Sequence, residues 1–306
     1  MGNENRNPSF LSNRSYQHEI DYERVGRFLQ ETYATAGEHI NWLQPRWEYM
    51  HFHPYIRKVD LSRIGIWEYR GDIVAVVHPE HFLGSAYFEL APEFHSLKEE
   101  MLNYAETHIS FVQDDGRRLR LFINDSDLEF QQLARQRGYV KTEWQDPMAQ
   151  FVIPHPFPNI QLPGGFKLQS LADENDLQQV DRVLWRGFDH GDEPPEGGIP
   201  DREFMQSAPN FRKALNIAAV APDGNYVAYA GLWFEPVNAI AYVEPVATDP
   251  SYRRMGLGRA AVLEGIRRCG EQGAQIAYVG STMPFYQSMG FRLLYQSTVW
   301  QRSWTE

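Results

Sequence analysis

The sequence predicts an α+β (α/β) protein in which one mixed fold is used twice, and three observations lead to this prediction. From Ala239 to Trp300 the apolar pattern indicates strand, helix, strand, helix and strand. A similar order of elements precedes it. Between the two, the proline- and glycine-rich stretch 154–165 can be neither helix nor central strand. We therefore expect a flexible N-terminus at 1–15, domains at 16–153 and 166–306, and a linker at 154–165.

The evidence for a repeat is a pair of short matches at similar offsets. Ala86-Tyr87-Phe88-Glu89 is similar to Ala241-Tyr242-Val243-Glu244 at an offset of 155 residues (241 − 86), and Gly138-Tyr139 is similar to Gly290-Phe291 at 152 (290 − 138). Two such offsets indicate one fold used twice, with a chance match as the alternative. The expected elements of the first copy are an amphipathic segment at 93–109, a strand at 118–123, a helix at 127–137 and a strand from residue 139.

A basic, glycine-spaced turn lies between the strand expected at 240–248 and a helix expected from Gly256. The break at residues 249–251 ends the strand, and the helix then carries one apolar stripe. Gly256 and Gly258 thus fall at the helix start, where the first N–H groups lack partners, the helix dipole is positive and no Cβ blocks a ligand. The sequence therefore predicts a phosphate site, to which Arg253, Arg254 and Arg259 add positive charge.

Two phosphate-binding classes fit this turn poorly. A P-loop requires Gly-x4-Gly-Lys-Ser/Thr, and both the lysine and the hydroxyl are missing here. The dinucleotide pattern Gly-x-Gly-x-x-Ala is met by Gly256, Gly258 and Ala261. However, residues 249–255 separate the strand from the first glycine, and the next apolar run, 275–281, ends without an acidic ribose ligand. A nicotinamide-dependent oxidoreductase is therefore the weaker alternative.

The segment Val246–Ala260 resembles the acetyl-CoA motif of the GCN5-related N-acetyltransferase (GNAT) family, whose (Arg/Gln)-x-x-Gly-x-(Gly/Ala) core is met by Arg253, Gly256 and Gly258. The later segment Pro284–Phe291 resembles the family's Tyr-x-x-x-Gly-Phe element. The resemblance implies two tandem GNAT-like domains, each a mixed, largely antiparallel sheet splayed at its centre and flanked by helices. One departure is that the family often has asparagine after the fifth strand, where this chain offers only hydroxyls.

The resemblance also implies a set of site residues. It places acetyl-CoA as the acyl donor, and it makes Tyr286 the general acid that protonates the departing thiolate. The residues expected to bind the donor are Val246, Ala247, Thr248, Arg253, Arg254, Met255, Gly256, Leu257, Gly258, Arg259, Ala260 and Ser281.

The general base is suggested by the residues themselves. Glu244 is the only carboxylate in the apolar strand that leads to the turn, and partial burial would make it a better base. The alternative is a structural role in which Glu244 pairs with an arginine. A water or the C-terminal carboxylate of Glu306 would then be the base. Pro245 removes a strand N–H, which predicts a bulge that splays this strand from its neighbour.

The first copy lacks this chemistry. Where the second copy has the glycine turn, the first has Glu93–Lys98, without glycine and followed by two acids, and Ala134 replaces Tyr286 at the 152 offset. We therefore expect a degenerate N-terminal domain and donor binding by the C-terminal domain alone.

The expected function is acetyl transfer from acetyl-CoA to a primary amine of a small molecule or peptide, by direct attack in a ternary complex. A CoA-binding sensor or scaffold without turnover is the alternative. Six acids in residues 189–203 either attract a cationic acceptor or form a solvated loop, and the aromatic segment 42–55 either lines the acceptor cleft or packs in the core.

Composition excludes several other classes. The net charge of −11 argues against nucleic-acid partners, and no apolar run reaches the about 18 residues of a membrane span. The single cysteine, Cys269, lies on an apolar helical stripe and should be core. The histidine pairs at 51 and 53 and at 78 and 81 have no convincing third ligand, so we expect no metal. Without an N-terminal signal region the expected location is the cytoplasm, and oligomerisation is possible but not inferable.

Overall fold

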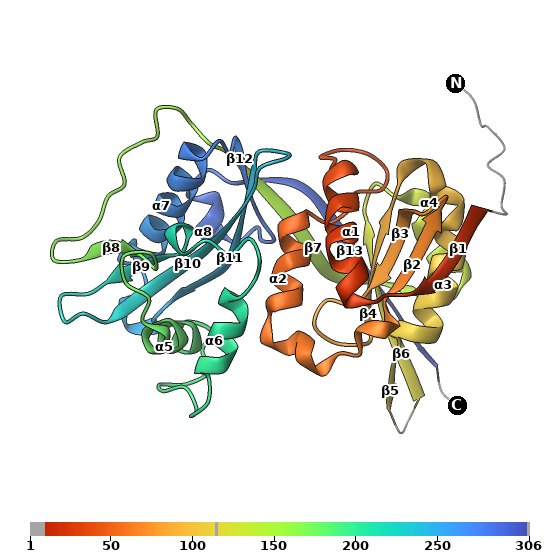
Figure 1. Ribbon diagram of the computed structural model, residues 1–306, viewed down its shortest axis with the longest axis horizontal. Helices are drawn as coiled ribbons and strands as arrows, with labels where there is room; N and C mark the ends of the chain where they lie inside the picture. Colours follow the sequence, from red (N-terminus) through yellow and green to blue (C-terminus); the bar gives the residue numbers. More distant parts are fainter. Residues whose placement is uncertain (1–9, 114–115, 305–306) are drawn as a thin grey trace. The chain divides into compact units, whose positions relative to one another are not determined.

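The computed structural model describes residues 10–113 and 116–304, and these form two compact units (Figure 1). Unit 1 takes its residues from the ranges 1–50, 55–146 and 295–306, and unit 2 consists of 51–54 and 147–294. Each unit contains one mixed sheet with helices against it, as the sequence predicts. None of the helices within the described ranges is long and apolar enough to span a membrane.

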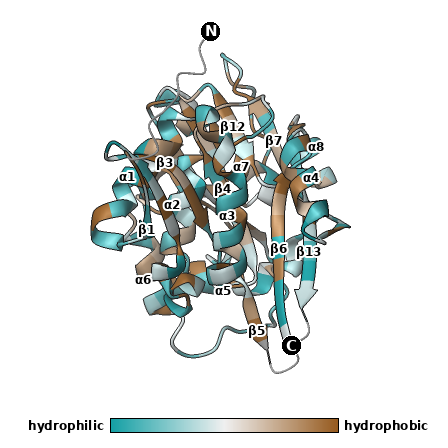
Figure 2. Ribbon diagram, turned by 90° about the vertical axis from the view of Figure 1, so that its right-hand side faces the viewer, coloured by the Kyte–Doolittle hydropathy of each residue, from teal (hydrophilic) through white to brown (hydrophobic). Residues whose placement is uncertain are grey.

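The sheet of unit 1 has the strand order β1-β2-β3-β4-β6-β13, with β5 paired to β6. Neighbours are antiparallel except β4 and β6, which are parallel. Strand β3 carries a buried apolar run along its length (Figure 2). The strands are β1 (Leu11–Ser15), β2 (Gly65–Tyr69), β3 (Asp72–His78), β4 (Ser85–Leu90), β5 (Phe111–Gln113), β6 (Gly116–Asn124) and the later part of β13 (Arg292–Trp304), and the helices are α1 (His18–Glu31), α2 (Gln44–Phe52), α3 (Lys98–Tyr104) and α4 (Leu128–Gln136).

The sheet of unit 2 has the order β7-β12-β11-β10-β9-β8, and again a single neighbouring pair, β11 and β12, is parallel. Helix α7 packs on β10 and β9 and brings Val262, Ile266 and Cys269 into the core, so the predicted stripe is confirmed. The strands are β7 (Val140–Val152, from its middle onward), β8 (Lys167–Ser170), β9 (Ile217–Val220), β10 (Tyr226–Glu235), β11 (Ile240–Thr248) and β12 (Ile276–Val279), and the helices are α5 (Leu177–Gly187), α6 (Ile199–Gln206), α7 (Leu257–Glu271) and α8 (Pro284–Gln287).

The unit bounds differ from the predicted domain bounds at the last strand of each copy. Residues 149–152 of β7 pair with β12 in unit 2, whereas residues 297–304 of β13 pair with β6 in unit 1. Alternating apolar residues define which face of a strand is buried but not which strand lies beside it. The predicted linker, 154–165, consequently lies inside unit 2, and a fragment cut there would lose a strand of its sheet.

The N-terminal segment is also more ordered than expected from residue 11 onward. Strand β1 pairs with β2 along its whole length. Its Arg14 donates hydrogen bonds to the buried carboxylate of Asp21 and to Glu68, which attaches the segment to α1 and β2. Residues 1–9 of the expected flexible N-terminus, and Glu306, lie outside the described residues.

Candidate active site

A cavity of about 660 Å³ lies in unit 2 where β11 ends and α7 begins. Its wall also includes the end of α5 and the start of α8. Nine of the twelve residues expected to bind the donor line it: Val246, Ala247, Thr248, Arg253, Arg254, Gly256, Leu257, Gly258 and Arg259. The other three do not: Met255 is 41% exposed, Ala260 is buried in α7, and the Ser281 hydroxyl accepts a hydrogen bond from the backbone of Met283.

The glycine turn forms the start of helix α7 and leaves its first N–H groups exposed to the cavity side of the turn. Gly256 is the N-cap of α7 and has φ 83°, a conformation that favours glycine, and a Cβ at this position would meet open space. The Ala260 N–H donates to the Gly256 carbonyl at 2.9 Å, so the N–H groups of residues 257–259 precede the first helical hydrogen bond. At Gly258 a Cβ would come within 2.5 Å of Thr248 Oγ1. The missing side chain therefore lets α7 begin directly against the end of β11.

The three arginines of the turn have different surroundings. The Arg253 guanidinium donates to the Gly187 carbonyl and to Asp189 Oδ1, each at 2.9 Å, and so joins the turn to the end of α5. Arg254 and Arg259 are exposed, and neither guanidinium has a hydrogen bond or ion pair with any residue in the described part of the chain. These two side chains are therefore the ones available to an anion in the cavity.

Two cavity residues at the end of α5, Gly187 and Phe188, were missed by the sequence analysis, because nothing in the local pattern marks them. Phe285 and Ser288 lie in the segment that resembles the family's Tyr-x-x-x-Gly-Phe element, but their place in the cavity was not predicted. A Cβ at Gly187 would lie 2.6 Å from that of Ala247, so this glycine allows α5 to approach β11 closely. A glycine at the end of an amphipathic helix indicates a turn, but it does not indicate what the turn touches.

Strand β11 separates from β12 beside the cavity. The parallel pairing ends at Tyr242 and Tyr278, although β11 continues to Thr248. On its other edge, Ala230 pairs with Val246 and Leu232 with Val243, so two residues of β11 face Gly231 alone. The bulge predicted from Pro245 is therefore confirmed.

Glu244 lies in this bulge. Its carbonyl accepts a hydrogen bond from Trp233 Nε1 at 2.9 Å, and its Oε2 accepts one from the Tyr242 hydroxyl at 2.7 Å. A Cβ at Gly231 would be 2.8 Å from the Glu244 carbonyl oxygen, so the bulge requires glycine opposite. Glu244 is half-buried and does not itself line the cavity.

Tyr286 lies in α8, lines the cavity and is 9% exposed. Burial, and after it the negative charge of Glu244, raises the pKa of the Tyr286 hydroxyl above its ordinary value. No residue in the described ranges forms a hydrogen bond with this hydroxyl. Tyr286 is therefore protonated at neutral pH and able to donate to a group in the cavity.

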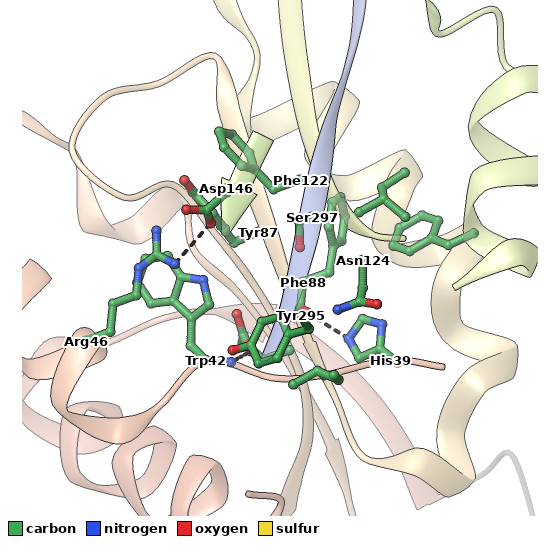
Figure 3. Close-up of a pocket in the computed structure, with 14 residues that line it drawn as sticks. His39, Trp42, Arg46, Tyr87, Phe88, Phe122, Asn124, Asp146, Tyr295 and Ser297 are labelled. Carbon is green, nitrogen blue, oxygen red and sulfur yellow. Dashed lines mark hydrogen bonds and ion pairs between the residues drawn. The ribbon is translucent and has the colours of Figure 1, made fainter. Parts of the chain in front are cut away.

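The corresponding place in unit 1 is nearly filled. The pairing of β4 with β6 ends at Ala86 and Leu121, and beyond it lies a cavity of only about 30 Å³ (Figure 3). Residues 39–42 occupy the free edge of β4: His39 Nε2 donates to the Phe88 carbonyl at 2.9 Å, and Asn41 bonds both backbone groups of Leu90.

Side chains also close the unit 1 cavity from the side of α2. The Arg46 guanidinium lies 4.0 Å from the centre of the Trp42 ring and pairs with Asp146 at 3.0 Å (Figure 3). Lys98 is the first residue of α3, the helix whose place in the predicted repeat matches that of α7. Its ammonium group donates to Asp127 at 2.8 Å and to Glu129 at 2.9 Å, so its charge is compensated. In unit 1, the protein's own groups thus fill most of this place.

Other candidates have structural explanations. The aromatic segment 42–55 contributes Trp42, Trp47 and Tyr49 to the buried core. Three of the six acids in 189–203 form ion pairs: Asp189 with Arg253, Asp192 with Arg186, and Glu193 with Arg182. Across the described ranges, no three His, Cys, Asp or Glu residues are placed to hold a metal ion.

Comparisons with known proteins agree on one family. The profile of the Acetyltransferase (GNAT) family matches residues 177–291. Glucosamine 6-phosphate N-acetyltransferase of Trypanosoma brucei brucei is 31% identical over 110 residues, which are 32% of this chain and 73% of that protein. Mycothiol acetyltransferase of Thermomonospora curvata is 28% identical over 155 residues, 46% of this chain and 51% of that protein, so the chain matches only about half of the latter.

Two solved structures share the fold over nearly the whole chain. A GCN5-related N-acetyltransferase from Sphaerobacter thermophilus has a TM-score of 0.66 at 14% identity and covers 98% of this chain and 97% of its own. A tandem GNAT protein from the clavulanic acid biosynthesis pathway has a TM-score of 0.62 at 12% identity, covering 96% and 98%. At these identities the likeness concerns the fold alone, which is the tandem fold predicted from the sequence.

Proposed function

Since the chain belongs to the GNAT acetyltransferase family, we propose that unit 2 transfers the acetyl group of acetyl-CoA to a primary amine of a small molecule or peptide. The observation that carries this proposal is the joint arrangement of a glycine-rich helix start, an opened strand pair and a buried tyrosine around one cavity. The chain is an N-acetyltransferase by family, and the family uses acetyl-CoA as donor. The roles of individual residues are our proposal.

The donor's pyrophosphate is bound at the start of α7. The N–H groups of residues 257–259 and the positive helix end supply hydrogen bonds and partial charge, and Arg254 and Arg259 add two full charges. The pantetheine chain then follows the edge of β11 that β12 leaves unpaired after Tyr242, with its amides bonding to backbone groups near Val246 and Thr248.

Glu244 prepares the acceptor. An amine with a lysine-like pKa near 10.4 is protonated at pH 7, and freeing its lone pair costs roughly 4 to 5 kcal/mol. Glu244, directly or through a water, takes that proton. The amine nitrogen then attacks the thioester carbonyl carbon.

Tyr286 assists departure of the thiol. As the new C–N bond forms and the C–S bond breaks, the electron pair of the broken bond goes to sulfur, and Tyr286 donates its proton there. The newly acylated nitrogen loses its second proton, which returns to the Tyr286 oxygen directly or through a water. The raised pKa of this hydroxyl keeps the proton in place until charge develops on sulfur. The products are an acetylated amine and CoA with a free thiol.

The test is a thiol-release assay with acetyl-CoA and a panel of amines. The panel contains glucosamine 6-phosphate, because one relative is named for it, together with aminoglycosides, polyamines, amino acids and peptides. We expect amine-dependent thiol release with at least one class and stoichiometric acetylated product by mass spectrometry. Binding of CoA without release from any amine would indicate a scaffold instead of an enzyme.

A further inference from the structure

A hydrogen bond joins Tyr242, which does not line the cavity, to Glu244, the proposed base. The Tyr242 hydroxyl donates to Glu244 Oε2 at 2.7 Å, and Tyr242 itself is 1% exposed. A tyrosine hydroxyl retains its proton at neutral pH, so in this pair the carboxylate is the acceptor. The interaction is therefore a charge-assisted hydrogen bond in a partly buried setting, which is stronger than a neutral one.

The position of Tyr242 in the sheet makes it a firm support. It occupies the last register position at which β11 pairs with β12, opposite Tyr278, and the strands separate immediately after it. A Cβ at Gly280 would lie 3.6 Å from the Tyr242 hydroxyl, so the chain that leaves β12 passes close to this group. Tyr242 thus lies at the last paired position before β11 and β12 separate.

The main chain of Glu244 is held separately. Trp233 Nε1 binds its carbonyl, and the bulge opposite Gly231 sets the direction of the backbone. With the backbone fixed at one end and a carboxylate oxygen fixed at the other, little rotational freedom is left to the side chain. A carboxylate that accepts a hydrogen bond is also favoured in its charged, proton-accepting form.

We infer that Tyr242 is a positioning residue for acetyl transfer, whose hydroxyl orients the Glu244 carboxylate and keeps it ionised for proton abstraction. This inference rests on the proposed function of Glu244. It assigns Tyr242 no contact with the substrates, since its hydroxyl acts through the carboxylate.

The experiment is the pH dependence of kcat/KM for the amine, from about pH 5.5 to 9.5, in wild type, Tyr242→Phe and Tyr278→Phe. Tyr278→Phe is the matched control, because it removes the hydroxyl of an equally buried tyrosine at the paired position of β12. For Tyr242→Phe we expect the acidic limb of the kcat/KM profile to shift to higher pH by about one unit, with the affinity for acetyl-CoA unchanged. The control should keep the wild-type limb.

A double variant separates positioning from general damage. In a Glu244→Gln background, Tyr242→Phe should leave the pH profile unchanged from that of Glu244→Gln alone, because the glutamine amide cannot take up the proton that the Glu244 carboxylate would accept. A Tyr242→Phe profile that is scaled without a shift overturns the role of Tyr242, as does an equal shift in the Tyr278 control. A wild type that acetylates no amine overturns the proposed function itself.

Discussion

The negative charge of Glu244 acts on Tyr286, where it adds to burial in raising the pKa of the tyrosine hydroxyl. The two residues reach the site from different elements, the bulge of β11 and helix α8. The charge of Glu244 thus favours the neutral phenol that Tyr286 needs in order to act as the acid, an arrangement suited to a base and an acid acting in one reaction.

Tyr286→Phe should lower kcat far more than it weakens acetyl-CoA binding. The change removes one hydroxyl that matters mainly as charge develops on sulfur, and the loss should be about 10²- to 10³-fold, as for other lost transition-state donors. Steady-state kinetics and calorimetry measure the two effects. Because the pKa of Tyr286 is raised, its ionisation should produce no decline of the wild-type rate below pH 9. Unchanged kcat in the variant would remove Tyr286 from the chemistry.

Glu244→Gln should reduce activity most at acidic to neutral pH. There the amine is almost entirely protonated and a base is needed, whereas near the amine's own pKa the rate should partly recover. A pH–rate profile measured from pH 6 to 10 distinguishes this from a structural effect. A profile of wild-type shape that is merely lower would make Glu244 structural, and a water would then be the better candidate for the proton acceptor.

Gly256→Glu should abolish CoA binding. The new side chain enters the helix start and places a negative charge where the pyrophosphate is proposed to bind. The matched control is Gly224→Glu, which puts the same side chain at a glycine of φ 91° with open space around it, outside the cavity. Both glycines have a positive φ, so both variants place a side chain on a left-handed backbone, and a CoA-induced thermal shift kept by Gly224→Glu and lost by Gly256→Glu locates the site. Equal shifts in both would mean that the turn does not bind CoA.

Gly231→Ala should disturb the bulge that presents Glu244. Its Cβ would lie 2.8 Å from the Glu244 carbonyl oxygen and 2.9 Å from Pro245 Cδ, so the strand must move. Overpacking of this kind costs about 1–3 kcal/mol of unfolding free energy, and we expect a lower Tm together with lower kcat. Gly164→Ala, where a Cβ meets nothing within 4 Å, is the control and should change neither. A fully active Gly231→Ala enzyme would show that the geometry of the bulge is not needed.

The parts of the site with local chemical signals could be predicted from the sequence. The helix start at Gly256 and the bulge at Pro245 follow from glycine and proline, whose conformational restrictions act within a few residues. The partners of Arg253 could not be predicted, because Asp189 lies 64 residues away and only tertiary packing brings it near. The same holds for His39, whose hydrogen bond to the Phe88 carbonyl helps to fill the place in unit 1 where β4 and β6 separate. It also holds for the last strand of each copy, because alternating apolar residues do not determine which strand pairs with it.

The central claim is that one of two similar units binds the donor while the other is closed by its own residues 39–42. Isothermal titration of the full chain with acetyl-CoA tests this most directly. The account predicts one site per chain in the wild type and no detectable site in Gly256→Glu, with Gly224→Glu binding as the wild type does. Two sites per chain, or one site that persists in Gly256→Glu, would contradict it.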